Sequence, residues 1–147
     1  MKNQLLSLLS QPLEVLVDDV ESLNSSLHYD FYWCEENQKK KKLASLFRET
    51  DKVDLPGVII CQTRLEVSDV MNYLSSSFPT LSHIAVTVET PFQERREIMK
   101  QFQEGETSLL VATAGIIGRG IELVNAHTVM CTRLLWIDCP VVISFIH

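Results

Sequence analysis

Glycine and proline are scarce in this sequence, five of each in 147 residues, and aromatic residues make up only 7%. That composition excludes collagen-like and low-complexity chains. No apolar run approaches the roughly 18 to 20 residues that cross a membrane. The N-terminal stretch also has too short an apolar segment, and no small-residue cleavage site, for a secretory signal. We therefore expect a packed protein of the cytoplasm or nucleus with no membrane partner.

Metal-site patterns and excess basic charge are also missing. The four cysteines show no CxxC pair and no Cys/His ligand spacing, so we expect buried, reduced thiols and no bound metal. A net charge of −6 excludes a grip on nucleic acid by the whole surface, so any such contact must come from a few locally placed arginines and backbone amides. The one basic run, QKKKKLASLFRE at 38–49, is typical of a solvated helix face.

Short apolar runs and helical patterns alternate along the chain, whose length fits one domain. The runs are β-branched with little polar alternation, as in strands covered on both faces, and they lie at 57–61, 81–88, 108–113 and 127–131. Helical patterns occupy 64–78 and 91–105, and DFYWC at 30–34 is a weaker strand candidate. This alternation predicts a parallel sheet with helices on both faces.

Three of the predicted strands end in segments suited to binding anions. These segments, at 61–64, 88–96 and 112–122, each combine hydroxyl or amide side chains with arginine. Backbone amides at helix starts favour anions, and arginine presents a planar fork to phosphate oxygens. Because the carboxyl ends of parallel strands share one edge of the sheet, we expect the three segments to line a phosphate-binding groove there.

In order and spacing, these segments resemble the C-terminal RecA-like domain of DEAD-box ATP-dependent RNA helicases. GVIICQTR resembles motif IV, QERR resembles the QxxR element, ATAGIIGRGIEL resembles motif V, and IDCPVVISFIH resembles the Asp-x-Pro helix that delivers the motif VI histidine. The resemblance implies a three-layer α/β/α fold with a mainly parallel central sheet, incomplete at its C-terminus. We expect this domain at 30–147, preceded by an N-terminal segment at 1–29.

The resemblance also implies roles for individual residues. One residue, Glu122, would accept a hydrogen bond from the ribose of ATP. The others would contact the RNA backbone, which positions the strand without reading bases; they are Thr63, Arg64, Gln93, Arg96, Thr113, Gly118, Arg119 and Gly120.

Several positions depart from the family pattern. Motif V normally has an aspartate after its threonine, where this chain has Ala114, and one extra residue precedes Arg119. Glu122 replaces another aspartate, and Val88 and Glu89 stand where His-Gly is usual. These departures put the coupling to ATP in question.

The expected function is that of one of the two RecA-like domains that together make an ATP-dependent RNA helicase. The chain has no GxxxxGK[ST] phosphate loop, and it stops at His147, before the arginines that normally follow this histidine. We therefore expect no catalytic residue in this chain alone and an uncovered part of the sheet. ATP and Mg²⁺ would be bound only with a separate N-terminal RecA-like domain. Two alternatives stay open, namely a degenerate scaffold that binds RNA or protein partners without ATP hydrolysis, and an unrelated domain for a small phosphorylated ligand.

Overall fold

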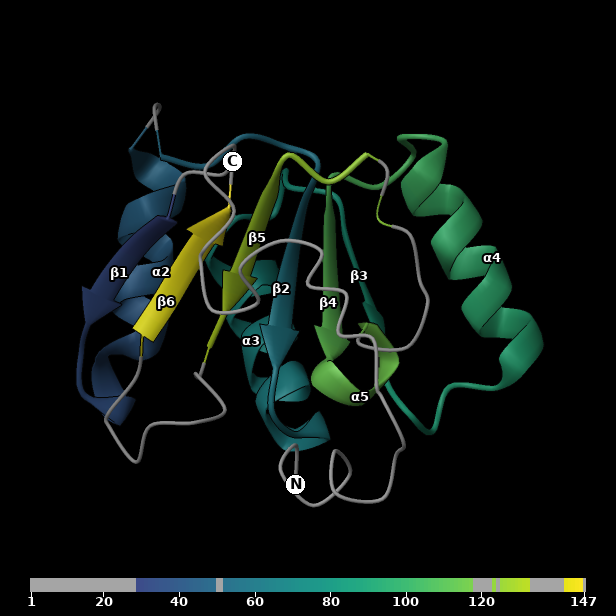
Figure 1. The fold of residues 1–147 in the computed structure, drawn as a ribbon, viewed down its shortest axis with the longest axis horizontal. Helices are drawn as coiled ribbons and strands as arrows, with labels where there is room; N and C mark the ends of the chain where they lie inside the picture. The colour runs from purple at the N-terminus through teal and green to yellow at the C-terminus, as the bar shows by residue number, and fades with distance from the viewer. Residues whose placement is uncertain (1–28, 50–51, 118–122, 124, 133–141, 147) are drawn as a thin grey trace, which may run out of the picture.

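The computed structural model describes residues 29–49, 52–117, 123, 125–132 and 142–146, which form a central sheet between two layers of helix (Figure 1). The sheet has six strands in the order β1-β6-β5-β2-β4-β3. Their bounds are β1 (Tyr29–Trp33), β2 (Gly57–Cys61), β3 (His83–Val86), β4 (Leu109–Thr113), β5 (Thr128–Cys131) and β6 (Val142–Ile146).

The middle of the sheet is parallel. Gly57 at the start of β2 is aligned with Leu109 of β4 on one side and with Thr128 of β5 on the other. β3 continues parallel beyond β4, whereas β6 runs antiparallel to both β5 and β1. All of β4 is buried, which explains its unbroken apolar sequence. The predicted RecA-like α/β class, with a mainly parallel sheet, is confirmed.

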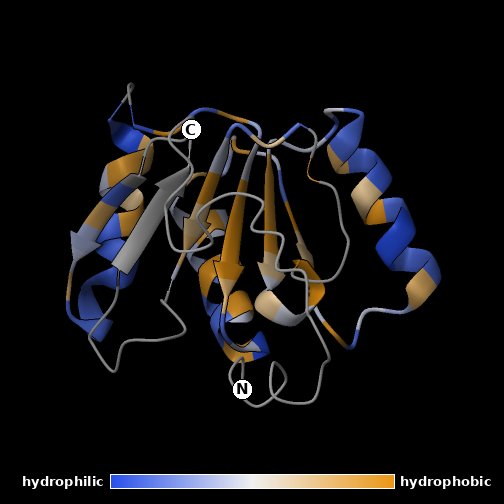
Figure 2. Ribbon diagram, in the orientation of Figure 1, coloured by the Kyte–Doolittle hydropathy of each residue, from blue (hydrophilic) through white to orange (hydrophobic). Residues whose placement is uncertain are grey.

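Helices cover both faces of this sheet (Figures 1 and 2). On one face, Leu46 and Leu74 from two helices pack with Ile59 of β2; on the other, Phe102 packs with Val58 of the same strand. Successive side chains of a strand point to opposite faces, so β2 serves both cores. The first face carries α2 (Lys39–Arg48), which follows the short η1 (Glu36–Gln38), and α3 (Arg64–Ser77); the second carries α4 (Phe92–Gln103) and α5 (Ala114–Ile117).

The two long helices after β2 and β3 begin and end where their sequence signals lie. Thr63 is the N-cap of α3, and its hydroxyl accepts a hydrogen bond from the amide of Glu66 at 3.2 Å. α4 begins directly after Pro91 and is followed by Gly105, whose φ of 77° is in the left-handed region. The predicted helices at 64–78 and 91–105 are therefore confirmed.

The C-terminal prediction of a helix is wrong. Residues 142–146 form β6, paired with β1 in the register Trp33↔Val142 to Tyr29↔Ile146. The reason lies in the residues themselves, because this stretch is rich in β-branched and aromatic side chains, which favour a strand. The same pairing makes the weaker strand candidate at 30–34 a real strand.

The N-terminal segment expected at 1–29 lies outside the described residues except for Tyr29. In the part that the structure describes, none of the helices has the length and apolar character to cross a membrane.

Candidate nucleic-acid interface

The carboxyl ends of the parallel strands, at the bottom of Figure 1, meet at one edge of the sheet, which we call the carboxyl edge. It comprises the β2–α3 loop at Gln62 and Thr63, the β3–α4 loop at 87–91, and Ala114 after β4. The neighbouring strands β2 and β4 send their following helices, α3 and α5, to opposite faces of the sheet. Ligands of open α/β sheets bind at such a switch point, and this is the edge where the sequence predicts the phosphate-binding groove.

The β2–α3 loop is held by the first turn of α3. While Thr63 accepts from the amide of Glu66, the Glu66 Oε2 atom accepts from the amide of Gln62 at 2.9 Å. These reciprocal bonds satisfy amides at a helix start, where no intrahelical partner exists. Thr63 and Arg64 remain exposed on this ordered loop. Both are therefore presented to solvent at the carboxyl edge.

The β3–α4 loop is a closed turn. The amide of Thr90 donates to the Thr87 carbonyl at 3.1 Å, and the Thr87 amide donates to the Thr90 hydroxyl at 3.0 Å. Arg95 then folds back over the turn, donating to the Thr90 carbonyl from Nε at 3.1 Å and from Nη2 at 2.9 Å. Sequence reasoning missed this role of Arg95, because a neighbouring arginine matched the family pattern instead.

An ion pair between Arg64 and Glu89 joins the two loops. Both side chains are well exposed, at 60% and 62%. Sequence analysis assigned Arg64 to RNA and noted Glu89 only as a departure from the family. Nothing in a single sequence indicated that these two residues, from separate loops, would meet.

Gln93 and Arg96 lie at the start of α4, and both side chains are exposed. Neither makes a hydrogen bond or an ion pair with any other described residue. Arg64 and Glu89 link the two loops, and Gln93 and Arg96 take no part in that link. The polar groups of Gln93 and Arg96 are therefore available to a ligand.

Thr113, the last residue of β4, is placed next to Cys61 of β2. Its side chain is buried, with only 5% of the residue exposed, and its hydroxyl has no hydrogen-bond partner among the described residues. A buried hydroxyl without a partner costs about 1 to 3 kcal/mol. The remaining predicted site residues, Gly118, Arg119, Gly120 and Glu122, lie outside the described residues, as does His147.

Comparison with known protein families matches residues 38–146 to the helicase conserved C-terminal domain. The chain belongs to this family. It is 31% identical over 123 residues, 84% of its length, to the rat protein named "Probable ATP-dependent RNA helicase DDX59". It is also 27% identical over 124 residues to DEAD-box ATP-dependent RNA helicase 41 of Arabidopsis thaliana and 28% identical over 119 residues to the ATP-dependent RNA helicase eIF4A of Saccharomyces cerevisiae.

These matches cover 84% of the chain for the plant relative and 81% for the yeast relative. Conversely, the chain spans only 20%, 24% and 29% of the rat, plant and yeast proteins. The molecule is thus a helicase C-terminal domain of the DEAD-box RNA helicase family, and the predicted family assignment is confirmed.

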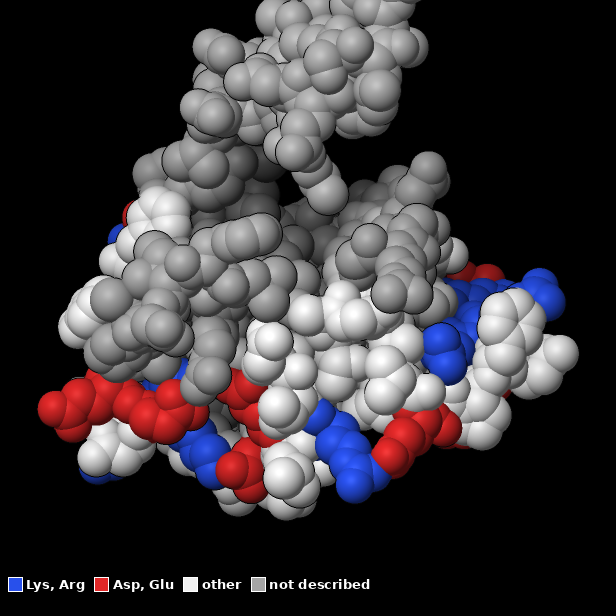
Figure 3. All heavy atoms as spheres, turned by 60° about the horizontal axis from the view of Figure 1, so that its bottom comes forward, with Lys and Arg blue, Asp and Glu red and all other residues white. Residues whose placement is uncertain are grey.

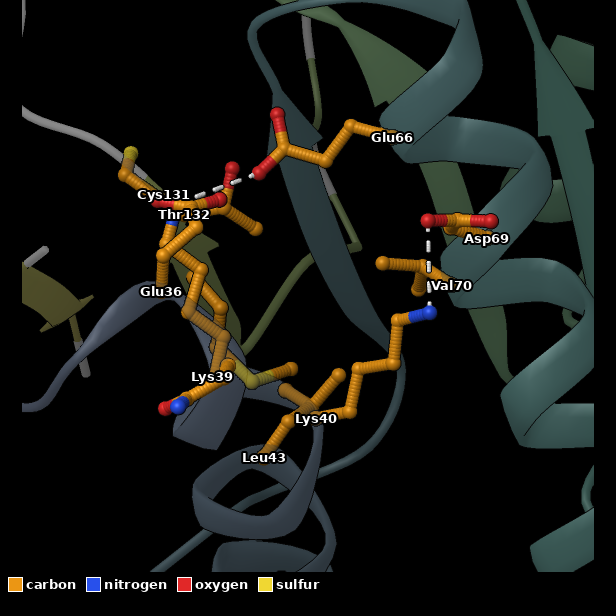
Figure 4. A pocket seen from close by; sticks show the side chains of 11 residues that line it. Glu36, Lys39, Lys40, Leu43, Glu66, Asp69, Val70, Cys131 and Thr132 are labelled. Carbon is orange, nitrogen blue, oxygen red and sulfur yellow. Dashed lines mark ion pairs between the residues drawn. The ribbon is translucent and has the colours of Figure 1, made fainter.

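This helicase C-terminal domain also has a pocket of about 440 Å³ between α2 and α3 (Figure 4). Lys39 reaches into it and forms ion pairs with Glu36 at 2.8 Å and with Glu66 at 3.5 Å. Its Nζ has no hydrogen-bond partner among the described residues, so the attraction is between the charges. Lys40 pairs with Asp69 at 3.2 Å across the mouth. The prediction that the basic run at 38–49 forms a solvated helix face is therefore wrong for Lys39, whose side chain is only 10% exposed.

The described cysteines Cys34, Cys61 and Cys131 are free thiols; Cys34 and Cys61 are buried, as expected, whereas Cys131 is half-buried. Burial raises the pKa of Cys61 to about 12, and it also raises the pKa of Cys34 and of Cys131. These thiols stay protonated at neutral pH, which makes them poor nucleophiles and poor metal ligands. The described part of the chain also has no group of three or more His, Cys, Asp or Glu side chains arranged for a metal.

Proposed function

We propose that this chain is the second RecA-like domain of a DEAD-box-type ATP-dependent RNA helicase. In this role it binds the RNA sugar-phosphate backbone at the carboxyl edge and completes an ATP site with a separate N-terminal RecA-like domain. The observation that carries the proposal is the exposure of Gln93 and Arg96 at the start of α4, on the same edge as Thr63 and Arg64.

Phosphate suits this edge for two physical reasons. First, α3 and α4 both begin there, and the amides and dipole of a helix start attract anions. Second, arginine binds phosphate oxygens with paired, charge-assisted hydrogen bonds. Contacts of this kind tolerate any base sequence, and hydroxyls of the ribose are what distinguish RNA from DNA.

Thr113 has a conditional place in this proposal. Its hydroxyl is buried, so a contact with RNA phosphate requires the residues around it to open. A phosphate oxygen there would supply the hydrogen bond that the hydroxyl lacks among the described residues. Gly118, Arg119 and Gly120 would line the same RNA path.

The ATP part of the proposal rests on family membership. Glu122 would hold the ribose of ATP, and Mg²⁺ would be bound with the phosphates by the N-terminal RecA-like domain. ATP supplies the chemical energy, while the residues of this chain bind and orient. A chain of this family would act in the cytoplasm or the nucleus.

A second function, an RNA- or protein-binding scaffold without ATP hydrolysis, is favoured by one observation. Ala114 stands where motif V of the family has a carboxylate, and it begins α5 as a half-buried residue. RNA-stimulated ATP hydrolysis by the protein together with an N-terminal RecA-like domain would contradict the scaffold. RNA binding without such hydrolysis would support it.

The first experiment measures binding of single-stranded RNA as a function of salt. Arg96→Ala should weaken binding of every RNA sequence and make the dependence of log affinity on log salt shallower by about 0.7, because one phosphate contact is lost. The control is Lys100→Ala, which removes an exposed cation from the last turn of the same helix. Equal behaviour of Arg96→Ala and the wild type would remove Arg96 from the site. A wild type that does not bind RNA would overturn the proposal.

A further inference from the structure

The Arg64–Glu89 ion pair places a carboxylate where the proposed function needs a free cation. Arg64 is the first residue of α3 and comes directly after Thr63, within the proposed RNA site. One nitrogen of its guanidinium, Nη1, is already paired with Glu89. Figure 3 looks onto this edge, and blue and red surfaces of the described residues lie side by side there rather than forming one blue area.

Glu89 is held in place by its own loop. Its amide donates to the Thr87 hydroxyl at 3.3 Å, within the turn that the Thr90 amide closes. Arg95 fixes the far side of the turn through the Thr90 carbonyl and, at 3.4 Å, the Val88 carbonyl. The carboxylate is therefore presented to Arg64 by an ordered turn, with little freedom left for its backbone.

A carboxylate and a phosphate offer the same kind of anionic oxygen to an arginine fork, so both compete for one guanidinium. An ion pair as exposed as this one contributes only about 0 to 1 kcal/mol, because water and salt screen it. A backbone phosphate of RNA carries the same single negative charge, and it can replace Glu89 because the other contacts of this edge hold the strand next to Arg64.

We infer that Glu89 is an internal competitor for RNA at Arg64. It occupies the guanidinium in the free protein, is displaced when an RNA phosphate binds, and returns when RNA leaves. This inference rests on the proposed RNA function. Its consequence is weaker binding and faster release of RNA than the arginines of this edge alone would give.

The experiment compares RNA binding by the wild type and by Glu89→Gln, which keeps the side-chain size and removes the charge. Glu89→Gln should bind single-stranded RNA about two- to fivefold more tightly at low salt, as expected for removal of an exposed ion pair. The matched control is Glu94→Gln, which removes an equal charge from the first turn of α4. Its gain should be smaller, because no ion pair with Arg64 is involved.

The decisive test repeats both substitutions with Arg64→Ala. In that background Glu89→Gln should gain no more affinity than Glu94→Gln, since the contested guanidinium is gone. An equal gain from Glu89→Gln with and without Arg64 would overturn the inference and leave RNA binding in place. No binding of RNA by the wild type or by any variant would instead overturn the proposed function.

Discussion

Cys61 lies at the end of β2, under the loop that carries Thr63, and its side chain is fully buried. Burial is the main reason that its pKa rises to about 12, with a smaller contribution from the nearby charge of Glu66. The folded protein thus keeps this proton at a pH where the unfolded chain releases it. The free energy of unfolding therefore depends on pH in the alkaline range through the ionisation of Cys61.

The linkage has a definite sign. Because the folded pKa is raised from about 9, the contribution of Cys61 to stability is fully present below pH 9 and is lost as the pH rises toward 12. Between pH 8.5 and 10.5 the wild type should lose about 1 to 2 kcal/mol more free energy of unfolding than Cys61→Ala. Urea unfolding of both proteins at the two pH values measures this. Parallel losses in the two proteins would contradict the assignment.

Sequence reasoning reached single residues only where a local pattern fixed them. Gly105 acts at a helix end within its own segment, so its structural role is readable from sequence. The N-cap role of Thr63 is equally local, but the sequence analysis assigned this residue only to RNA. Glu89 and Thr113 are different, because a partner or its absence depends on segments far away in the chain. Only the structure shows the ion pair of Glu89 and the buried hydroxyl of Thr113, which has no partner among the described residues.

At the scale of elements, α2 and α3 are joined by two lysines with different surroundings. Lys39 is nearly buried between Glu36 and Glu66, whereas Lys40 meets Asp69 at the surface. Both lysines belong to one basic run, and the sequence pattern around them does not show which one is buried. The difference arises because α3 packs over one of them.

This difference predicts unequal costs for matched substitutions. Lys39→Met removes the cation beside a mostly buried Glu66 carboxylate and should lower the free energy of unfolding by about 2 kcal/mol. Lys40→Met removes an exposed pair and should cost at most about 0.5 kcal/mol. Chemical denaturation of the two variants gives the comparison. Equal costs would mean that the ion pairs of Lys39 do not link the two helices.

The elements themselves divide by the kind of signal they carry. β2 and β4 were predicted because burial on both faces leaves an apolar run, and α3 and α4 because their apolar positions recur with the helical period. For β6 the family pattern predicts a helix, whereas its β-branched residues favour the strand that the structure contains. Its strand pairing depends on β1, which its own sequence does not contain.

At the scale of the whole molecule, we expect the central strands of the sheet to be locally more stable than its edge strands. β2 and β4 are paired on both sides and covered on both faces, whereas β1 and β3 each pair on one side with another described strand. Amide protons of β2 and β4 should therefore exchange with solvent at least about tenfold more slowly than those of β1. Hydrogen exchange read by mass spectrometry or NMR measures this. Equal protection of β1 would contradict this gradient of stability.

The overall class was predictable because the alternation of strands and helices leaves few topologies. The order of strands outside the parallel region was not, since the antiparallel β1–β6 pair has no local signal for its register. The candidate site could be predicted at the carboxyl edge for the same topological reason. Its charge pairing depends on which loops approach each other, and that follows only from the assembled fold.

The pairing of β1 with β6 also has a consequence for biosynthesis. β1 is made early, but its partner on the sheet is made near the end of the sequence shown here, as the register of Trp33 with Val142 requires. During synthesis β1, with its exposed Phe31 and Trp33, would keep an unpaired edge while the middle of the sheet forms. β1 is therefore among the last of the described strands to be paired, and a chaperone would find it most accessible in the nascent chain.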